Sequence, residues 1–131
     1  MNFLGVDYGE KRIGLALGSD ETKTAVPFGI IENKSRAFII EGIRKICQAE
    51  SIGKIVVGLP LTLRGETGRQ AKEVKKFVDF LKNNLFLQVT TEDERLTSAM
   101  VDKIMRESKN KAERDAVAAM LILQGYFNQN K

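Results

Sequence analysis

Residues 3–18 read FLGVDYGEKRIGLALG and contain two apolar runs separated by a short polar segment. The pattern predicts a buried strand over Phe3–Asp7, a hairpin turn, and a second strand over Arg12–Gly18. A doubly wound dinucleotide-binding fold would instead begin with a strand, a glycine-rich turn and a helix. The glycines of the second run fall within a strand, so we expect a fold that starts with antiparallel strands.

The rest of the chain changes between strand and helix periodicity. Continuous apolar runs favour strands covered on both faces, and apolar residues that repeat every three to four positions favour amphipathic helices. The expected elements are a strand over Ala25–Ile31, a helix over Ser35–Glu50 with Ser35 as its N-cap, a strand over Lys54–Gly58, a helix over Arg69–Asn83, a strand over Phe86–Thr90, a helix over Leu96–Ser108 and a deeply buried helix over Glu113–Phe127.

This order of elements predicts an α/β fold. Three leading antiparallel strands followed by parallel crossovers give a mixed five-stranded sheet flanked by helices on both faces. The length suits one domain, and no linker or repeat divides the chain, so we expect residues 1–131 to form a single domain.

The composition excludes several kinds of chemistry. The 131 residues include no histidine and one cysteine, Cys47. A Ser-His-Asp or Cys-His nucleophile is therefore excluded, as are a Cys/His zinc site and an intramolecular disulfide. Hydrolytic chemistry in this chain has to come from carboxylates, lysines, hydroxyls or hard metal ions held by oxygen ligands.

Charge and hydropathy indicate the surroundings of the protein. The formal net charge is +4 and the isoelectric point is about 9.3, which permits a polyanionic partner without requiring one. No apolar run approaches the roughly 20 residues of a membrane span, and residues 1–5 lack the charged segment of a signal peptide. We therefore expect a cytoplasmic protein with no membrane partner.

Three acidic positions are candidates for a reaction centre. Asp7 ends the first strand, Glu94 follows the fifth strand within Asp93-Glu94-Arg95, and Asp115 lies in the first turn of the last helix. Each position also has a purely structural explanation. Asp7 can cap the turn, the triplet and Glu92 can form a solvated loop, and the helix dipole favours an acid at the position of Asp115.

The topology brings these acids toward one edge of the sheet, because the carboxyl ends of parallel strands lie together. Two carboxylates about 4 Å apart repel each other by roughly 4 kcal/mol at an effective dielectric of 20, and a divalent cation removes that repulsion. Mg²⁺ and Mn²⁺ prefer oxygen ligands, and paired ions can activate water for phosphodiester cleavage. The acids and the missing histidine are both compatible with metal-dependent hydrolysis.

Basic residues supply candidate phosphate contacts. The connection between the fourth strand and the following helix carries Arg64 and Arg69, which suit bidentate contacts, and backbone N–H groups near its end can meet a phosphate. It lacks the Gly-Lys-Ser/Thr ending of a P-loop, and a plain connection without a ligand remains an alternative. Lys11, Arg12 and Arg95 either pair with adjacent acids or hold a substrate backbone.

Four motifs, taken in order, resemble those of one known family. They are GVDYGEKRIGLA at 5–16, Gly58-Leu59-Pro60 with Gly65 and Gly68, Asp93-Glu94-Arg95-Leu96-Thr97-Ser98, and Asp115 followed by Ala118-Ala119 and Leu121-Ile122-Leu123-Gln124. The set resembles the YqgF family of pre-16S rRNA nucleases, also described as Holliday junction resolvases, over nearly the whole chain. Any one motif is weak, whereas four in order are specific.

The resemblance implies an RNase H-like fold similar to that of the RuvC-type resolvases. It also implies a hydrolase, a metal-dependent endonuclease acting on structured nucleic acid, with Mg²⁺ or Mn²⁺ as cofactor. Asp7, Glu94 and Asp115 match the catalytic, metal-binding acids of the family. The implied setting is ribosome biogenesis, through 5′-end processing of pre-16S rRNA, with nucleic acid and the ribosomal particle as partners and either a monomer or a homodimer as the active state.

Other functions stay open at this point. The same acids suit a resolvase of branched DNA. The family often has Asn where Thr62 stands, which bears on the substrate contact of that loop. It often has an acid or Ser where Ala116 stands, and this departure leaves room for a nucleic-acid-binding ribosome-assembly or transcription factor with vestigial acids. Actin-like ATPases share the core fold, but they close two such domains around ATP and this chain supplies one.

Overall fold

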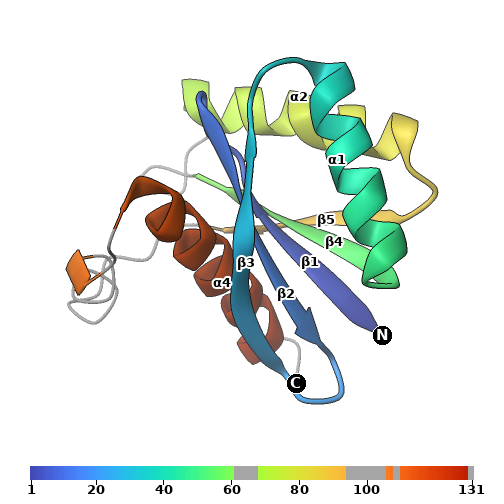
Figure 1. The fold of residues 1–131 in the computed structure, drawn as a ribbon, viewed down its shortest axis with the longest axis vertical. Helices are drawn as coiled ribbons and strands as arrows, with labels where there is room; N and C mark the ends of the chain where they lie inside the picture. The colour runs from blue at the N-terminus through green and yellow to red at the C-terminus, as the bar shows by residue number, and fades with distance from the viewer. Residues whose placement is uncertain (61–67, 94–105, 108–109, 130–131) are drawn as a thin grey trace.

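One mixed sheet organises the molecule (Figure 1). The computed structural model describes residues 1–60, 68–93, 106–107 and 110–129, and within them five strands lie in the order β3-β2-β1-β4-β5. β1 pairs antiparallel with β2, and β2 with β3, whereas β1, β4 and β5 run parallel, which confirms the predicted sheet. The strands are β1 (Asn2–Asp7), β2 (Arg12–Ser19), β3 (Thr24–Glu32), β4 (Ile52–Leu59) and β5 (Gln88–Asp93).

Helices cover both faces of this sheet. α1 (Arg36–Ala49) and α2 (Arg69–Asn84) pack on one face, and α4 (Lys111–Gln129) packs on the other (Figure 1). The helix expected over Leu96–Ser108 lies outside the described residues, apart from positions 106–107.

Alternation along β1 divides the interior into two cores. Leu4 and Val6 pack with the apolar faces of α1 and α2. Phe3 points the other way and meets Phe127 of α4 edge-on, with ring centroids 5.3 Å apart. Residues 3, 5 and 7 therefore share the face covered by α4, because side chains alternate along a strand. The Asp7 carboxylate lies on that face.

α1 begins where the sequence predicts. Ser35 has an extended backbone, and its Oγ accepts a hydrogen bond from the N–H of Phe38 at 3.1 Å, as expected of an N-cap. Cys47 lies in the buried stripe of this helix and is 8% exposed. Burial raises the pKa of its thiol to about 11, so Cys47 is an unreactive core residue, as predicted.

β5 differs from its predicted position. The sequence predicts a strand over Phe86–Thr90, but β5 starts at Gln88 and continues to Asp93, and Phe86 is fully exposed. The interpretation of Glu92 as part of a solvated loop is wrong, because this side chain is only 7% exposed. Glu92 pairs with Gly58 two residues beyond the pair of Thr90 with Val56, so it shares the face covered by α4.

α4 is less buried than the sequence predicts. The sequence predicts a helix that is apolar and buried almost all round, whereas α4 buries one face and leaves its other residues partly or fully exposed. The reason is that only the sheet covers it among the described elements. Neither α4 nor another described helix combines the length and the hydropathy that a membrane crossing requires.

Candidate active site

Asp7 ends β1, at the carboxyl edge of the sheet, and its side chain is only partly exposed. It lies opposite Gly14 of β2. On its other side Val6 pairs with Val57 of β4, so the next residue along β4, Gly58, lies beside Asp7. Because glycine has no side chain, neither neighbouring strand places a side chain directly beside the Asp7 carboxylate, and on the β2 side the backbone of α4 packs over Gly14.

Gly14 also explains how Asp115 reaches the same place. A Cβ atom on Gly14 would lie 1.9 Å from the backbone oxygen of Asp115 and 3.2 Å from the nitrogen of Ala116. The first turn of α4 can therefore pack directly on the backbone of β2 only because residue 14 is glycine. Since Gly14 is paired with Asp7, this contact brings Asp115 and Asp7 to one site.

The two acids influence each other electrostatically. Burial, and secondarily the negative charge of Asp115, raises the pKa of the Asp7 carboxyl from its ordinary 3.8 to about 6. Such a shift shows that the ionised form of Asp7 is poorly compensated at this position. A cation placed between the two carboxylates would restore the charged form.

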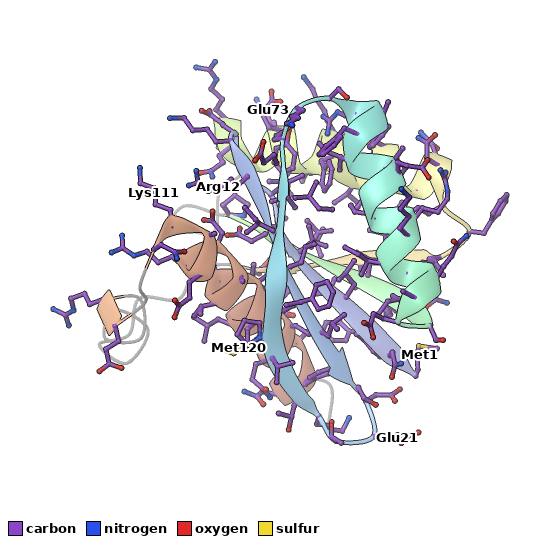
Figure 2. The ribbon with its side chains drawn as sticks, viewed as in Figure 1. Met1, Arg12, Glu21, Glu73, Lys111 and Met120 are labelled. Atoms are coloured by element: carbon purple, nitrogen blue, oxygen red, sulfur yellow. The ribbon has the colours of Figure 1, made fainter. Side chains whose placement is uncertain are left out.

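Arg12 pairs with one of the two acids. Its Nε donates a hydrogen bond to Oδ2 of Asp115 at 2.6 Å, and the two side chains are 30% and 28% exposed. Figure 2 shows Arg12 at the same end of the molecule as Lys111, the first residue of α4. The sequence left open whether Arg12 pairs with an acid or holds a substrate, and in this structure it pairs with Asp115.

A cavity of about 660 Å³ lies near the end of β1, and Tyr8, Arg69 and Glu73 are among the residues that line it. It connects the residue after Asp7 with the first turn of α2. The ring of Tyr8 packs on Phe77, with centroids 4.4 Å apart, which fixes this wall. Arg69, predicted from the sequence to contact phosphate, lines this cavity together with Tyr8, the residue that follows Asp7.

The remaining predicted residues divide into two groups. Lys11 is exposed at the start of β2, next to Arg12. Glu94, Arg64 and Arg95 lie outside the described residues, so their predicted roles remain predictions.

Two residues near the site were missed or misread in the sequence. Gly14 is one, although a glycine inside a strand is a recognised signal of close backbone approach. The other is Glu92, whose pKa is raised by burial and by Asp93 against the opposing effect of a hydrogen bond with Gln129. Its burial depends on α4, so no local pattern reveals it.

The described part of the site fits a hard divalent cation. Asp7 and Asp115 supply carboxylate oxygens, which are the ligands that Mg²⁺ and Mn²⁺ prefer. The pKa of Asp7 is raised by burial and secondarily by the charge of Asp115, and a bound cation would offset both effects. Two acids are not a complete coordination sphere, and no larger acidic group able to hold a metal occurs within the described residues. Glu94 is the predicted third ligand.

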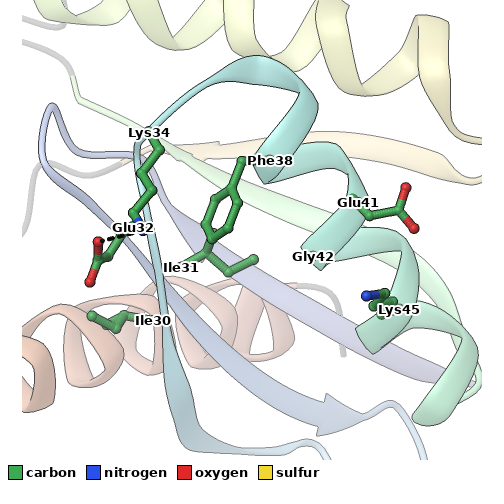
Figure 3. A pocket seen from close by; sticks show the side chains of 8 residues that line it. All are labelled: Ile30, Ile31, Glu32, Lys34, Phe38, Glu41, Gly42 and Lys45. Carbon is green, nitrogen blue, oxygen red and sulfur yellow. Dashed lines mark ion pairs between the residues drawn. The ribbon is translucent and has the colours of Figure 1, made fainter.

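A further cavity, of about 530 Å³, lies between the edge strand β3 and α1 (Figure 3). Ile31 and Phe38 contribute apolar surface, and Lys34 at its rim lies 3.6 Å from Glu32. None of the predicted catalytic acids lines this cavity. We assign it no part in the reaction.

Solved structures share the architecture of this chain. The structure of Thermus thermophilus RuvC has a TM-score of 0.63 and 12% sequence identity, covering 99% of this chain and 96% of that one. The complex of Fowlpox virus resolvase with Holliday junction DNA has a TM-score of 0.57 and 12% identity, covering 99% of each chain. At this identity the likeness concerns the fold alone, and it confirms an RNase H-like α/β protein.

Sequence comparison narrows this class to one family. The family model described as "RuvX: Holliday junction resolvase" matches residues 1–129, and the chain belongs to this family. A relative from Sulfurihydrogenibium sp., named "Putative pre-16S rRNA nuclease", is 41% identical over 96% of this chain and 89% of its own length. A relative of the same name from Chloroflexus aurantiacus is 38% identical over 98% of this chain and 87% of its own length. The resemblance drawn from the four motifs is confirmed.

Proposed function

We propose that the protein is a divalent-metal-dependent endonuclease that hydrolyses phosphodiester bonds at the 5′ end of pre-16S rRNA, in the cytoplasm and on a ribosomal particle. The names of the relatives support the substrate. The observation that carries the reaction class is the placement of Asp7 and Asp115 together at the carboxyl edge of the sheet, where burial and, secondarily, the charge of Asp115 raise the pKa of Asp7.

The acids have defined tasks in this proposal. Asp7, Asp115 and Glu94 hold Mg²⁺ or Mn²⁺, and the bound ion supplies Lewis-acid activation of the phosphodiester and of water. Asp7 binds the ion in its ionised form, so protons compete with the metal and binding weakens as the pH falls below the Asp7 pKa of about 6.

Basic residues around the site would hold the nucleic-acid backbone. Lys11 is exposed beside it, and Arg69 lines the adjacent cavity. We assign Arg64 and Arg95 the same task on the sequence alone. With three to four such contacts, binding should weaken with salt with a slope on the order of −2 to −4.

Cleavage of a pre-16S rRNA transcript tests the proposal. Wild type should shorten the 5′ end in Mg²⁺ or Mn²⁺, Asp7→Asn should lose this activity, and Asp79→Asn, which alters an exposed acid on α2, should retain it. Equal cleavage by wild type and Asp7→Asn would overturn the assignment of the site. RNA binding without cleavage by either protein would instead favour a non-catalytic assembly factor.

Resolution of branched DNA is the second candidate. The description of the family model supports it. The discriminating assay supplies a four-way DNA junction and the rRNA precursor to the same preparation. Faster cleavage of the junction, with symmetric nicks, would move the assignment from rRNA processing to resolution.

A further inference from the structure

We propose that Arg12 competes with the divalent ion for Asp115, and that metal binding frees its guanidinium for the substrate phosphate. This inference rests on the proposed metal-dependent nuclease and adds a positioning role for a residue of this chain. It makes Arg12 the link between metal binding and substrate binding.

The first observation is the contact between Arg12 and Asp115. The Nε–Oδ2 distance of 2.6 Å is short even for a hydrogen bond between charged groups, which are shorter and stronger than neutral ones. Both side chains are about seven-tenths buried, so solvent screens this pair less than a surface pair. Arg12 therefore holds, by a hydrogen bond, an oxygen of Asp115, which is a predicted metal ligand.

The second observation is the placement of the two acids. Gly14 seats the first turn of α4, with Asp115, on β2, and Gly14 is the strand partner of Asp7. An ion held by both acids needs an Asp115 oxygen at about 2.0–2.1 Å. A guanidinium at hydrogen-bond distance from the same carboxylate would repel that ion. It would also compete with the ion for the lone pairs of the carboxylate oxygens. Metal binding at both acids is therefore opposed by the Arg12 contact.

The third observation is where Arg12 is attached. It is the first residue of β2, a central strand whose register with β1 and β3 is fixed by pairing. A guanidinium displaced from Asp115 therefore stays at the edge of the site, beside the exposed Lys11. Its planar set of N–H donors suits bidentate contact with a phosphate. The same side chain can thus neutralise Asp115 before metal binds and then bind the substrate.

Calorimetric titration with Mn²⁺ tests the competition without any measurement of cleavage. Arg12→Gln should bind Mn²⁺ about fivefold more tightly than wild type, a factor that corresponds to ~1 kcal/mol. The matched control is Lys11→Gln, which removes the same charge from the neighbouring residue. It should change the affinity less than twofold. Arg12→Lys keeps the charge but loses the planar donor set, so it should fall between wild type and Arg12→Gln.

The outcomes distinguish the competition by Arg12 from the proposed metal-dependent function on which it rests. Equal or weaker Mn²⁺ binding by Arg12→Gln, or equal tightening by Lys11→Gln, overturns the competition while leaving the metal site in place. Absence of Asp7-dependent Mn²⁺ binding in wild type overturns the proposed metal-dependent function as well. Thermal melting of each variant establishes that the proteins compared are folded.

A second titration tests the release of Arg12 toward the phosphate. Mn²⁺ should raise the affinity of wild type for a phosphorothioate-substituted RNA, because metal and RNA then favour the same position of Arg12. In Arg12→Gln this gain should shrink at least threefold although the metal binds more tightly. An undiminished gain would overturn the role of Arg12 in linking the two ligands.

Discussion

Replacing Asp7 by Asn should stabilise the metal-free protein at neutral pH. The reason lies in the raised pKa of Asp7, which means that the folded protein binds the Asp7 proton more tightly than the unfolded chain does. Ionisation of Asp7 above its pKa is therefore a cost to folding. Asparagine has nearly the same shape and carries no charge, so it removes that cost.

The magnitude follows from the pKa difference. Between 3.8 in the unfolded chain and about 6 in the folded protein, the full effect is ~3 kcal/mol at 1.36 kcal/mol per pH unit. Asp7 keeps some exposure, and solvent screens its charge, so we expect about 1–3 kcal/mol. For a domain of this size that is a rise of about 3–10 °C in Tm.

The stability difference between wild type and Asp7→Asn should depend on pH in a defined direction. Well below pH 3.8 Asp7 is protonated in both the folded and the unfolded state, so wild type and Asp7→Asn should be equally stable. As the pH rises through the interval from 3.8 to about 6, wild type should lose stability relative to the variant. Above this interval the difference should be constant.

Differential scanning calorimetry in EDTA between pH 4 and 8 measures this difference. Asp79→Asn, on the exposed side of α2, controls for loss of a negative charge elsewhere. Mn²⁺ should then raise the Tm of wild type and leave Asp7→Asn nearly unchanged. If Asp7→Asn is less stable than wild type at pH 7, or if the difference is the same at pH 4, the electrostatic argument for the site is refuted.

Three more predictions concern other parts of the structure. Gly14→Ala should lower the free energy of unfolding, measured in urea, by at least about 1–3 kcal/mol, because its Cβ would strike the backbone of α4. The control Gly29→Ala should be nearly neutral, because its Cβ would have no neighbour within 4 Å. The Mn²⁺ affinity should rise up to tenfold per pH unit below about 6, the pKa of Asp7, and level off above it, because the proton has to leave before the metal binds. Arg36→Ala should lower the free energy of unfolding by about 1–2 kcal/mol, because the Arg36 guanidinium lies 5.2–5.6 Å from the centroids of three aromatic rings. In the same urea experiment Lys45→Ala, at an exposed position, should lower it by less than about 0.5 kcal/mol.

Much of the fold is encoded locally and could be predicted. The first two strands and α2 agree with the expected ranges to within one residue, because apolar periodicity and turn residues are local signals. The predicted range of β5 started too early, because the apolar run Leu85-Phe86-Leu87 resembles the start of a strand. In the fold, Leu85 ends α2 and packs with the core while Phe86 points into solvent. Periodicity alone cannot assign such a run to the end of a helix or the start of a strand.

The candidate site was predictable in its acids but not in their contacts. Asp7 and Asp115 stand out because carboxylates border apolar segments. The Arg12–Asp115 pair joins residues 103 positions apart, and it depends on the seat that Gly14 provides for α4. A charge next to another charge in the sequence suggests a partner, but a long-range pair depends on how helix and sheet are packed.

The burial of Cys47 has a practical consequence for kinetics. It is the single cysteine of the chain, and it faces the core beneath α1 with its thiol held in the protonated form. A thiol reagent can therefore modify the native protein only when α1 separates from the sheet. The rate of labelling in excess reagent reports the frequency of that opening in the wild-type chain, with no substitution introduced. Comparing the rate with and without Mn²⁺ would show whether an ion at the far edge of the sheet slows the opening of the α1 layer.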